Sequence, residues 1–283
     1  MISAPTEGAD TRRAAVLGHP IAHSLSPVIH RAAYSALGLP WQYDAIDVEP
    51  NGVEAFVAGC GPEWVGLSLT MPLKEAVLPV LTQHSPVVEL AQAANTVLFE
   101  AGERIGHNTD VTGMIAALAE AEVVSVDAAA VLGSGATARS ALVALQQMGA
   151  REVDVVARPG TSAERMLDLG RLLGLRIALV DWSDPSTGLQ RPLVISTVPS
   201  SVAASAVRWL PPEPGHLFDV IYAPWPTELG AAWSVNGVVL GGLDLLVHQA
   251  CGQIELMTGA CVPPQILRQA LDRRGSDPAP LVD

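Results

Sequence analysis

The chain has 283 residues, and 29 acidic side chains against 16 basic ones give it a formal net charge of −13. Hydrophobic residues make up 49% of the sequence, which excludes a disordered or fibrous chain and suffices for two packed domains. The acidic balance argues against a nucleic-acid partner, because phosphate backbones are bound by dense positive charge. We expect a small-molecule ligand instead, with its anionic groups held by a few local donors.

The N-terminal segment MISAPTEGADTRR carries acidic residues and no apolar core, so it predicts a tail and not a signal peptide. No apolar run is long enough to cross a bilayer. Three scattered cysteines, Cys60, Cys251 and Cys261, and seven histidines without ligand spacing argue against disulfides and against a bound metal. We therefore expect a cytoplasmic protein with reduced thiols, no metal ion and no membrane association.

From Ala14 onward, short β-like runs alternate with helical stretches. In the first part of the chain, runs at 14–18, 42–48 and 64–72 precede helical stretches at 28–37, 53–59 and 73–81. In the second part, runs at 128–135 and 152–158 precede helical stretches at 136–149 and 162–174. Two more strands, 217–222 and 237–240, precede a long helix at 241–259. This alternation predicts an α/β protein with largely parallel sheets.

Two changes in the pattern predict domain boundaries. The loop GHNTD meets a helix expected from Val111, and Gly241 and Gly242 open the long last helix. We predict an N-terminal α/β substrate-binding catalytic domain made of residues 1–111 plus 243–283, with a mostly parallel sheet. Residues 112–242 form a second α/β domain in this interpretation.

The second predicted domain carries a glycine loop, AAAVLGSGATARSAL, in the order strand, loop, helix. Gly133, Gly135 and Ala138 form the G-x-G-x-x-A variant of a dinucleotide fingerprint. Gly133 allows a tight turn, Gly135 lets the backbone approach a pyrophosphate, and the helix N-terminus offers N–H groups to that anion. A purely structural turn fits the pattern equally well, so further evidence must come from the next strand.

That next strand, EVDVVAR, ends at Arg158 without a carboxylate. NAD-specific sites place an acid there to bind the ribose 2′-hydroxyl, whereas an arginine suits the 2′-phosphate of NADP. A solvated arginine at a strand end is the structural alternative. Taken together, the two features predict a Rossmann-like domain that binds NADP.

In the first predicted domain, the loop GHPIAHSLSP places two serines one residue apart. If the loop is extended, the hydroxyls of Ser24 and Ser26 lie on the same side and can hold one carboxylate without adding charge. Ser26 before Pro27 also suits a helix N-cap, an alternative that leaves Ser24 unexplained.

Two further segments carry candidate acid–base groups. In SLTMPLKEAVLPVL, a helix beginning at Pro72 puts Lys74 in the first turn, where a cation opposes the helix dipole. In GHNTDVTG, Asp110 suits the helix cap and would pair with Lys74 if the two loops meet. Asn95, in AANTV, offers an amide for hydroxyl recognition. Each of these residues alone also fits a structural role, as an exposed lysine or a capping side chain.

In this order the segments PIAHSLSPVIH, LTMPLK, AANT, NTDVTG, GSGATAR and GGLDLLVHQA resemble those of the shikimate dehydrogenase family. The resemblance covers nearly the whole chain. It implies an NADP-dependent oxidoreductase that reversibly reduces 3-dehydroshikimate to shikimate in aromatic amino-acid (chorismate) biosynthesis. The alternatives are a quinate or aminoshikimate dehydrogenase on the same scaffold and a non-catalytic NADP(H)-sensing regulatory protein. A homodimer is a further expectation.

The resemblance also implies roles for individual residues. Lys74 would be the acid–base group, and Asp110 would orient the substrate and partner Lys74. The substrate carboxylate and ring hydroxyls would be bound by Ser24, Ser26, Thr70, Asn95, Asp110, Tyr222 and Gln249. The cofactor would be bound by Gly133, Ser134, Gly135 and Ala136 at the pyrophosphate, by Arg158 at the 2′-phosphate, and near the nicotinamide by Gly242.

Three positions depart from the family's pattern. Ser68 stands where asparagine is usual, Ala136 replaces a glycine, and the family's second phosphate-binding arginine falls on Ser162. Because one arginine remains for the 2′-phosphate, we expect NADP to be preferred with weakened discrimination against NAD.

Overall fold

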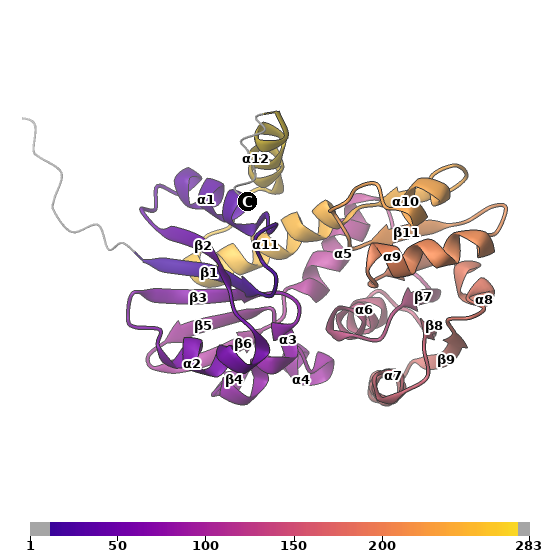
Figure 1. Ribbon diagram of the computed structural model, residues 1–283, viewed down its shortest axis with the longest axis horizontal. Helices are drawn as coiled ribbons and strands as arrows, with labels where there is room; N and C mark the ends of the chain where they lie inside the picture. Colours follow the sequence, from indigo (N-terminus) through magenta and orange to yellow (C-terminus); the bar gives the residue numbers. More distant parts are fainter. Residues whose placement is uncertain (1–11, 277–283) are drawn as a thin grey trace, which may run out of the picture. The chain divides into compact units, whose positions relative to one another are not determined.

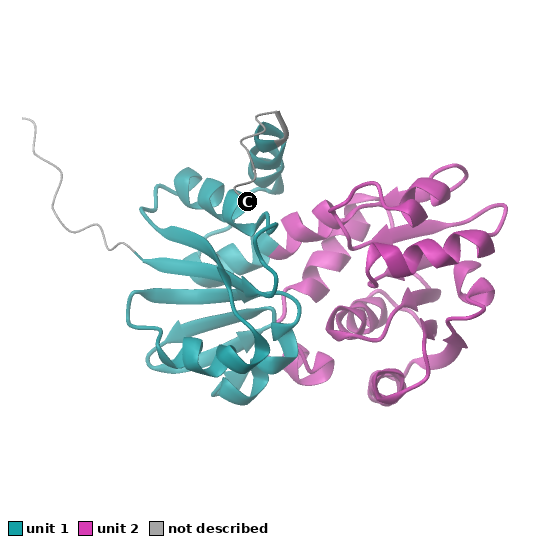
Figure 2. Ribbon diagram, in the orientation of Figure 1, with its two compact units in different colours: residues 1–84, 94–107, 250–283 teal, residues 85–93, 108–249 magenta. Residues whose placement is uncertain are grey.

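The computed structural model describes residues 12–276, so the predicted N-terminal tail falls almost wholly outside the described residues. The chain divides into two compact units, coloured separately in Figure 2, and each unit contains a six-stranded sheet. Unit 1 comprises Met1–His84, Ala94–His107 and Ala250–Asp283, and unit 2 comprises Ser85–Ala93 and Asn108–Gln249. The predicted α/β fold with mostly parallel sheets is confirmed. The predicted functional boundaries at residues 111 and 243 stay a prediction.

The sheet of unit 1 has the strand order β2-β1-β3-β5-β6-β4 (Figure 1). Its strands are β1 (Arg13–Gly18), β2 (Gln42–Asp47), β3 (Trp64–Leu69), β4 (Gln83–His84), β5 (Thr96–Glu100) and β6 (Glu103–His107). Strand β1 lies parallel to β2 and β3, whereas β5 runs antiparallel to both β3 and β6. The β5–β6 hairpin has no counterpart among the strands predicted from the sequence.

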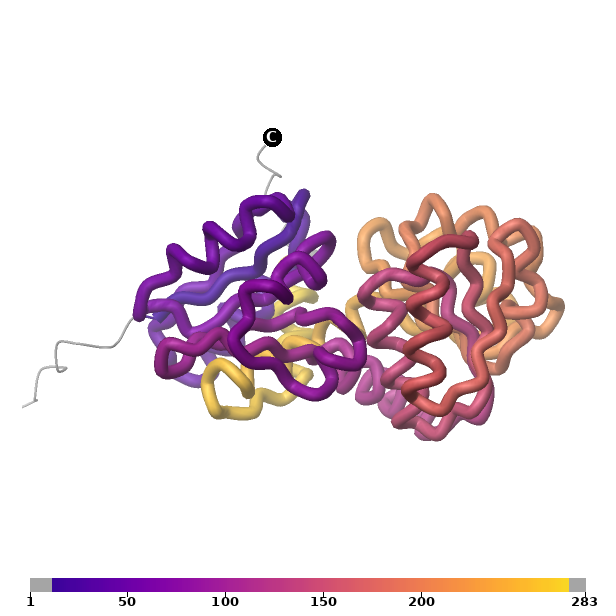
Figure 3. The backbone as a smooth tube through the Cα atoms, turned by 90° about the horizontal axis from the view of Figure 1, so that it is seen from below, coloured from indigo at the N-terminus to yellow at the C-terminus, as the bar shows by residue number. Residues whose placement is uncertain are grey.

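Helices pack against this first sheet because its central strands are largely apolar. Strand β3 is buried at every position, as expected for a strand covered on both faces. The helices of unit 1 are α1 (Ser26–Ala36), α2 (Val53–Ala58), α3 (Leu73–Ala76), the second half of α11 (Gly242–Thr258), and α12 (Pro264–Ser276), with 3-10 turns at Pro50–Gly52 and Leu78–Val80. Figure 3 shows the last, yellow part of the chain against the indigo strands of this unit. Met257 of α11 packs there in one apolar cluster with Val16 and Tyr34.

The sheet of unit 2 is wholly parallel, with the order β12-β11-β10-β7-β8-β9. Its strands are β7 (Ala128–Leu132), β8 (Glu152–Ala157), β9 (Arg176–Asp181), β10 (Leu193–Ser196), β11 (His216–Asp219) and β12 (Val238–Leu240). The chain moves outward from β7 in one direction and then returns to the other side at β10, which is the Rossmann strand order. Ligands of such sheets bind at the carboxyl ends of the strands, where the order reverses.

Successive residues of β7 face opposite sides of this sheet, as the two-residue period of a strand requires. Ala129 and Val131 belong to one apolar cluster, and Ala130 and Leu132 to another. Neighbouring strands and the helices of unit 2 supply further members of the two clusters. These helices are α4 (Pro86–Ala91), α5 (Asp110–Glu120), α6 (Ala136–Gln147), α7 (Thr161–Leu173), α8 (Ser186–Leu189), α9 (Ser200–Ala203), α10 (Glu228–Trp233) and the 3-10 helix Ala204–Trp209. None of the helices in the described part of the chain is long and apolar enough to cross a membrane.

Helix α4 belongs to unit 2 although it precedes the last two strands of unit 1 in the chain. Arg139 of α6 is 2% exposed and donates from Nε to the carbonyl oxygen of Ala91, at 2.6 Å. The amide of Asn108 donates to the carbonyl oxygen of Ala93, at 3.0 Å, and to the Ser140 hydroxyl, at 2.9 Å. These buried polar contacts hold the end of α4 against α6.

Candidate active site

The loops that follow β1 and β3 meet at the carboxyl ends of two neighbouring parallel strands. The amide of Thr70 donates to the carbonyl oxygen of Leu17, at 2.9 Å. A Cβ atom on Gly18 would lie 2.5 Å from Cγ2 of Thr70, so a side chain at position 18 would push the two loops apart. Glycine at this position therefore brings Thr70 next to the serine-containing loop.

Both serines of that loop are almost buried, with 9% of Ser24 and 6% of Ser26 exposed. Helix α1 begins at Ser26 itself, its N-cap residue is Leu25, and no side chain caps it from that position. The alternative in which Ser26 is the N-cap is therefore wrong. Ser24 provides part of the capping instead, because its Oγ accepts a hydrogen bond from the Ser26 amide, at 3.3 Å. This bond uses an acceptor site of Ser24 and leaves its hydroxyl hydrogen available for a ligand.

Lys74 and Asn95 belong to segments that are joined by backbone hydrogen bonds. Lys74 is the second residue of α3, a single turn, so the predicted helix over 73–81 is much shorter than expected. The backbone carbonyl oxygen of Lys74 accepts a hydrogen bond from the amide of Ala94, at 2.9 Å. The backbone carbonyl oxygen of Asn95 accepts one from the amide of Leu69, at 2.8 Å. The structure thus brings Thr70, Lys74 and Asn95 of unit 1 to the same edge of the sheet.

Asp110 and Gln249 are close neighbours within unit 2. Asp110 is 3% exposed and begins α5, and its amide donates to Oδ1 of Asn108, at 3.1 Å. One turn later, a Cβ atom on Gly113 would lie 2.8 Å from the backbone nitrogen of Gln249. The helices α5 and α11 touch through backbone at this glycine, which sets Gln249 beside the first turn of α5. Lys74 belongs to unit 1, and its pairing with Asp110 stays a prediction.

Tyr222 and Gly242 are also brought together, at the carboxyl ends of β11 and β12. The amide of Gly242 donates to the carbonyl oxygen of Ile221, at 3.2 Å. A Cβ atom on Gly242 would lie 2.3 Å from the carbonyl oxygen of Val220, so only glycine fits this approach. Asp219 holds the same loop by accepting from the amide of Ile221, at 3.2 Å. Burial raises the pKa of this carboxyl group above its usual value.

The glycine loop after β7 has the geometry that the fingerprint predicts. Gly133 has φ +110, and a Cβ atom there would lie 2.6 Å from Oγ1 of Thr197. Gly135 is the N-cap of α6, and no atom lies within 4 Å of its would-be Cβ. The backbone is therefore open to a ligand at Gly135 and Ala136, and the first N–H groups of α6 face that opening. Gly133 to Ala136 fit a dinucleotide pyrophosphate.

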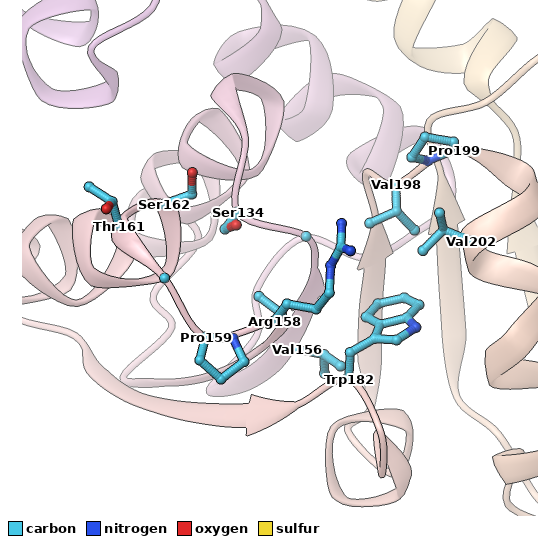
Figure 4. Close-up of a pocket in the computed structure, with 13 residues that line it drawn as sticks. Ser134, Val156, Arg158, Pro159, Thr161, Ser162, Trp182, Val198, Pro199 and Val202 are labelled. Carbon is cyan, nitrogen blue, oxygen red and sulfur yellow. The ribbon is translucent and has the colours of Figure 1, made fainter.

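A pocket of about 710 Å³ lies beside this loop, at the carboxyl ends of β7, β8 and β10. Figure 4 shows the Arg158 side chain reaching into it from the end of β8, beside Trp182. Ser134 and Ser162 lie on its rim, and none of the described residues that line it is acidic. The pocket therefore suits an anionic group better than the two hydroxyls of an unsubstituted ribose.

Sequence reasoning missed Trp182, Val198 and Pro199 as parts of this pocket. Trp182 follows β9, and Val198 and Pro199 follow β10, two strands that the apolar pattern did not predict. Trp182 is fixed in place because its Nε1 donates to the hydroxyl of Ser205, at 3.1 Å. The signal that could have found these residues is positional, since the carboxyl ends of the strands beside β7 form the binding edge.

Comparison with known proteins connects this chain to one family. A family model described as the shikimate dehydrogenase substrate binding domain matches residues 16–97. A relative from Citrifermentans bemidjiense, named shikimate dehydrogenase (NADP(+)), is 35% identical and aligns over 95% of this chain and 97% of its own length.

Two solved structures extend the match to the three-dimensional fold. Mycobacterium tuberculosis shikimate dehydrogenase is 38% identical with a TM-score of 0.84, over 93% of this chain and 99% of its own. The Thermus thermophilus shikimate 5-dehydrogenase, crystallised with NADP(H) and shikimate, is 31% identical with a TM-score of 0.77, over 93% and 99%. With this identity over nearly its full length, the chain belongs to the shikimate dehydrogenase family of oxidoreductases.

Proposed function

We propose that this protein catalyses the reversible, NADP-dependent interconversion of shikimate and 3-dehydroshikimate, in the direction of shikimate during aromatic amino-acid biosynthesis. The observation that carries the proposal is the edge of the first sheet, where the loop with two nearly buried serines meets the segments that carry Thr70, Lys74 and Asn95. A hydroxylated carboxylic acid matches this set, because hydroxyls can bind its carboxylate and an amide its ring hydroxyls. The relative from Citrifermentans bemidjiense carries the corresponding name.

The pocket of unit 2 supports NADP as the cofactor. The backbone of Gly133, Ser134, Gly135 and Ala136 would hold the pyrophosphate, and Arg158 would hold the 2′-phosphate through charge-assisted hydrogen bonds. Gly242 would lie near the nicotinamide, held in place by its close backbone approach to Val220. The bound nicotinamide supplies the acceptor or donor of a hydride.

The chain's own groups position the substrate and move its proton. Ser24 and Ser26 bind the carboxylate, with Tyr222 on that side, and Thr70, Asn95, Asp110 and Gln249 bind the ring hydroxyls. During oxidation the C3–H bond breaks with its electron pair leaving as hydride, and Lys74 accepts the proton of the C3 hydroxyl. During reduction Lys74 returns that proton to the carbonyl oxygen. Asp110 orients the substrate and Lys74 relative to each other for this proton transfer.

Composition gives independent support for the role of Lys74, which is the only lysine among 283 residues. Apart from the histidines, all other basic side chains are arginines, which stay protonated at any physiological pH. A lysine, in contrast, can lose its proton in a protein environment and act as a base. A chain that otherwise uses arginine throughout retains an ammonium group where proton transfer is required.

The deciding experiment is a spectrophotometric assay of the purified full-length protein with shikimate and with quinate, each with NADP+ and with NAD+. We expect the highest kcat/KM for shikimate with NADP+, and a measurable but lower value with NAD+ because one arginine faces the 2′-phosphate. Preference for quinate with NAD+, or binding of NADP(H) without oxidation of either acid, contradicts the proposal. We also expect the protein to act in the cytoplasm, and sedimentation of the purified chain would test the expected homodimer.

A further inference from the structure

Five buried polar side chains form one hydrogen-bonded group in unit 1. They are His30, Tyr43, Ser68, Thr96 and Gln253, and we call them the Gln253 network. None of the five is more than 3% exposed. They come from α1, β2, β3, β5 and α11, so the group joins five elements of one unit.

Gln253 is the centre of this network because its carboxamide uses both its donors and its acceptor. Its Nε2 donates to the carbonyl oxygen of Asn95 and to Oγ1 of Thr96, each at 3.0 Å. Its Oε1 accepts from the hydroxyl of Ser68, at 2.8 Å. Ser68 and Thr96 are paired directly across the antiparallel β3–β5 ladder, so one carboxamide from α11 bridges both strands.

On one side the network reaches Asn95, which is 1% exposed. The hydroxyl of Thr96 accepts from Gln253 and donates its single hydrogen to Oδ1 of Asn95, at 2.9 Å. The Asn95 amide oxygen is therefore held toward Thr96, and its two N–H donors lie on the other side of the carboxamide. Gln253 determines this direction, because it occupies the acceptor side of the Thr96 hydroxyl.

On the other side the network ends at Tyr43. The hydroxyl of Tyr43 donates to Ser68, at 2.7 Å. Burial raises the pKa of Tyr43 well above its usual value, so this phenol stays protonated and keeps its hydrogen in the network. Because Ser68 accepts from Tyr43, its own hydrogen is directed to Oε1 of Gln253 and holds the carboxamide in place.

His30 completes the network without adding a charge. Its Nε2 faces Oε1 of Gln253 at 3.3 Å, and its ring stacks on Tyr43 with centroids 4.0 Å apart. Burial lowers the pKa of His30 to about 3, so the ring is neutral at physiological pH. Among the described residues its Nδ1 has no hydrogen-bond partner, which fits the tautomer that carries its hydrogen on Nε2 and donates to Gln253.

A buried polar network of this kind is a costly way to stabilise a fold, since well-packed apolar residues often serve as well. One of its ends, in contrast, lies at Asn95, a side chain of the proposed substrate site. Ser68 stands where the family usually has asparagine, and in this chain α11 supplies the amide through Gln253 instead. Resting on the proposed function, we propose that Gln253 and Tyr43 are positioning residues that orient Asn95 for binding of shikimate, Gln253 through Thr96 and Tyr43 through Ser68 and Gln253.

The test compares Gln253→Met and Tyr43→Phe, two variants of nearly unchanged size, with Tyr34→Phe as the matched control. Tyr34 is a second buried tyrosine of the same apolar cluster as Tyr43, and its hydroxyl donates to the sulfur of Met257, outside the network. We expect about a tenfold higher KM for shikimate in the first two variants, because the loss of one hydrogen bond to an oriented group weakens binding by about that factor. The KM for NADP+ should not change, and Tyr34→Phe should keep the wild-type KM for shikimate.

Double-mutant cycles separate positioning from simple loss of stability, with melting temperatures measured in parallel. If Tyr43 acts through Asn95, Tyr43→Phe lowers kcat/KM for shikimate in the wild-type background but has no further effect in Asn95→Ala. Gln253→Met should likewise have no further effect in Asn95→Ala. Equal losses in both backgrounds, or a changed melting temperature with unchanged KM, overturn the inference while wild-type turnover of shikimate leaves the proposed function standing. A wild-type protein inactive with shikimate overturns both.

Discussion

The loops after β1 and β7 occupy comparable places, since each leaves the carboxyl end of a parallel strand and leads into a helix, yet they are built in opposite ways. After β1, the proposed recognition groups are the side chains of Ser24 and Ser26, which are nearly buried. After β7, the proposed recognition group is backbone, with Gly135 exposed and open space where its Cβ would be. The first loop depends on the identity of its side chains, and the second depends on conformation.

The two loops should therefore fail differently when mutated. Substitutions in the site around the loop after β1 should alter turnover of the substrate or affinity for it and leave cofactor binding unaffected. Substitutions in the loop after β7 should alter cofactor affinity, and there the presence of any side chain matters more than its chemistry. The following predictions test this contrast, beginning with the largest expected effect.

Lys74→Ala should lower kcat by a factor of about 10² to 10⁴, the usual contribution of a general acid–base group, while the KM for shikimate changes little. Because Lys74 is the only lysine, an amine-directed acylating reagent should modify this side chain and the N-terminal amine alone. Inactivation should follow the acylation of Lys74, as read by peptide mass spectrometry, and shikimate should slow it. A folded Lys74→Ala variant with near-normal kcat would falsify the assignment.

Arg158→Ala should raise the KM for NADP+ by about 10- to 100-fold, since hydrogen bonds to charged groups contribute about 1.5–3 kcal/mol. The KM for NAD+, which lacks the 2′-phosphate, should change little. The matched control is Arg171→Ala, on the exposed face of α7, where that arginine is paired with Asp168. Equal weakening of both cofactors in Arg158→Ala would remove Arg158 from phosphate recognition.

The two loop glycines offer a paired test of conformation against space. Gly133→Ala places a Cβ at φ +110 and 2.6 Å from Thr197, so it should reduce the free energy of unfolding by about 1–3 kcal/mol. Gly135→Ala meets no atom within 4 Å and should leave the melting temperature unchanged. It should nevertheless weaken NADP(H) binding, because its methyl group projects into the space expected for the pyrophosphate. A Gly135→Ala variant with wild-type cofactor affinity would contradict the pyrophosphate position.

The same contrast explains what could be predicted from the sequence. The strands β1 and β7 contain continuous apolar runs, and β8 is apolar apart from Glu152 and Asp154. Each strand is followed by a helix, and the glycine loop has a local pattern, so the sequence predicts these elements close to their observed places. Strand β10 has only four residues, and β9 alternates exposed and half-buried positions at the sheet edge, so neither gave a clear apolar run. Because β9 was not predicted, Trp182, which follows it, was not identified as part of the pocket.

Long-range polar contacts could not be predicted at all. Nothing in the local sequence of Gln253 distinguishes it from an exposed helical glutamine, because its partners Ser68 and Thr96 lie more than a hundred residues away in the chain. The alternative of Ser26 as the N-cap also failed, because the helix begins one residue earlier than the local Ser-Pro signal implies. The Ser26 amide donates instead to the hydroxyl of Ser24, two residues before it.

The smallest predicted effect concerns Trp182, whose indole forms one wall of the cofactor pocket and is anchored to Ser205. Trp182→Leu should weaken NADPH binding about two- to tenfold, because an aromatic wall contributes about 0.5–1.5 kcal/mol beyond the area it buries. Trp225→Leu, at a 43% exposed tryptophan outside the pocket lining, is the control and should bind normally. Adenosine 2′,5′-bisphosphate, which lacks the nicotinamide half, should lose the same factor if Trp182 contacts the adenosine. A loss confined to intact NADPH would move Trp182 to the nicotinamide side and weaken the assignment of Arg158, which lines the same pocket.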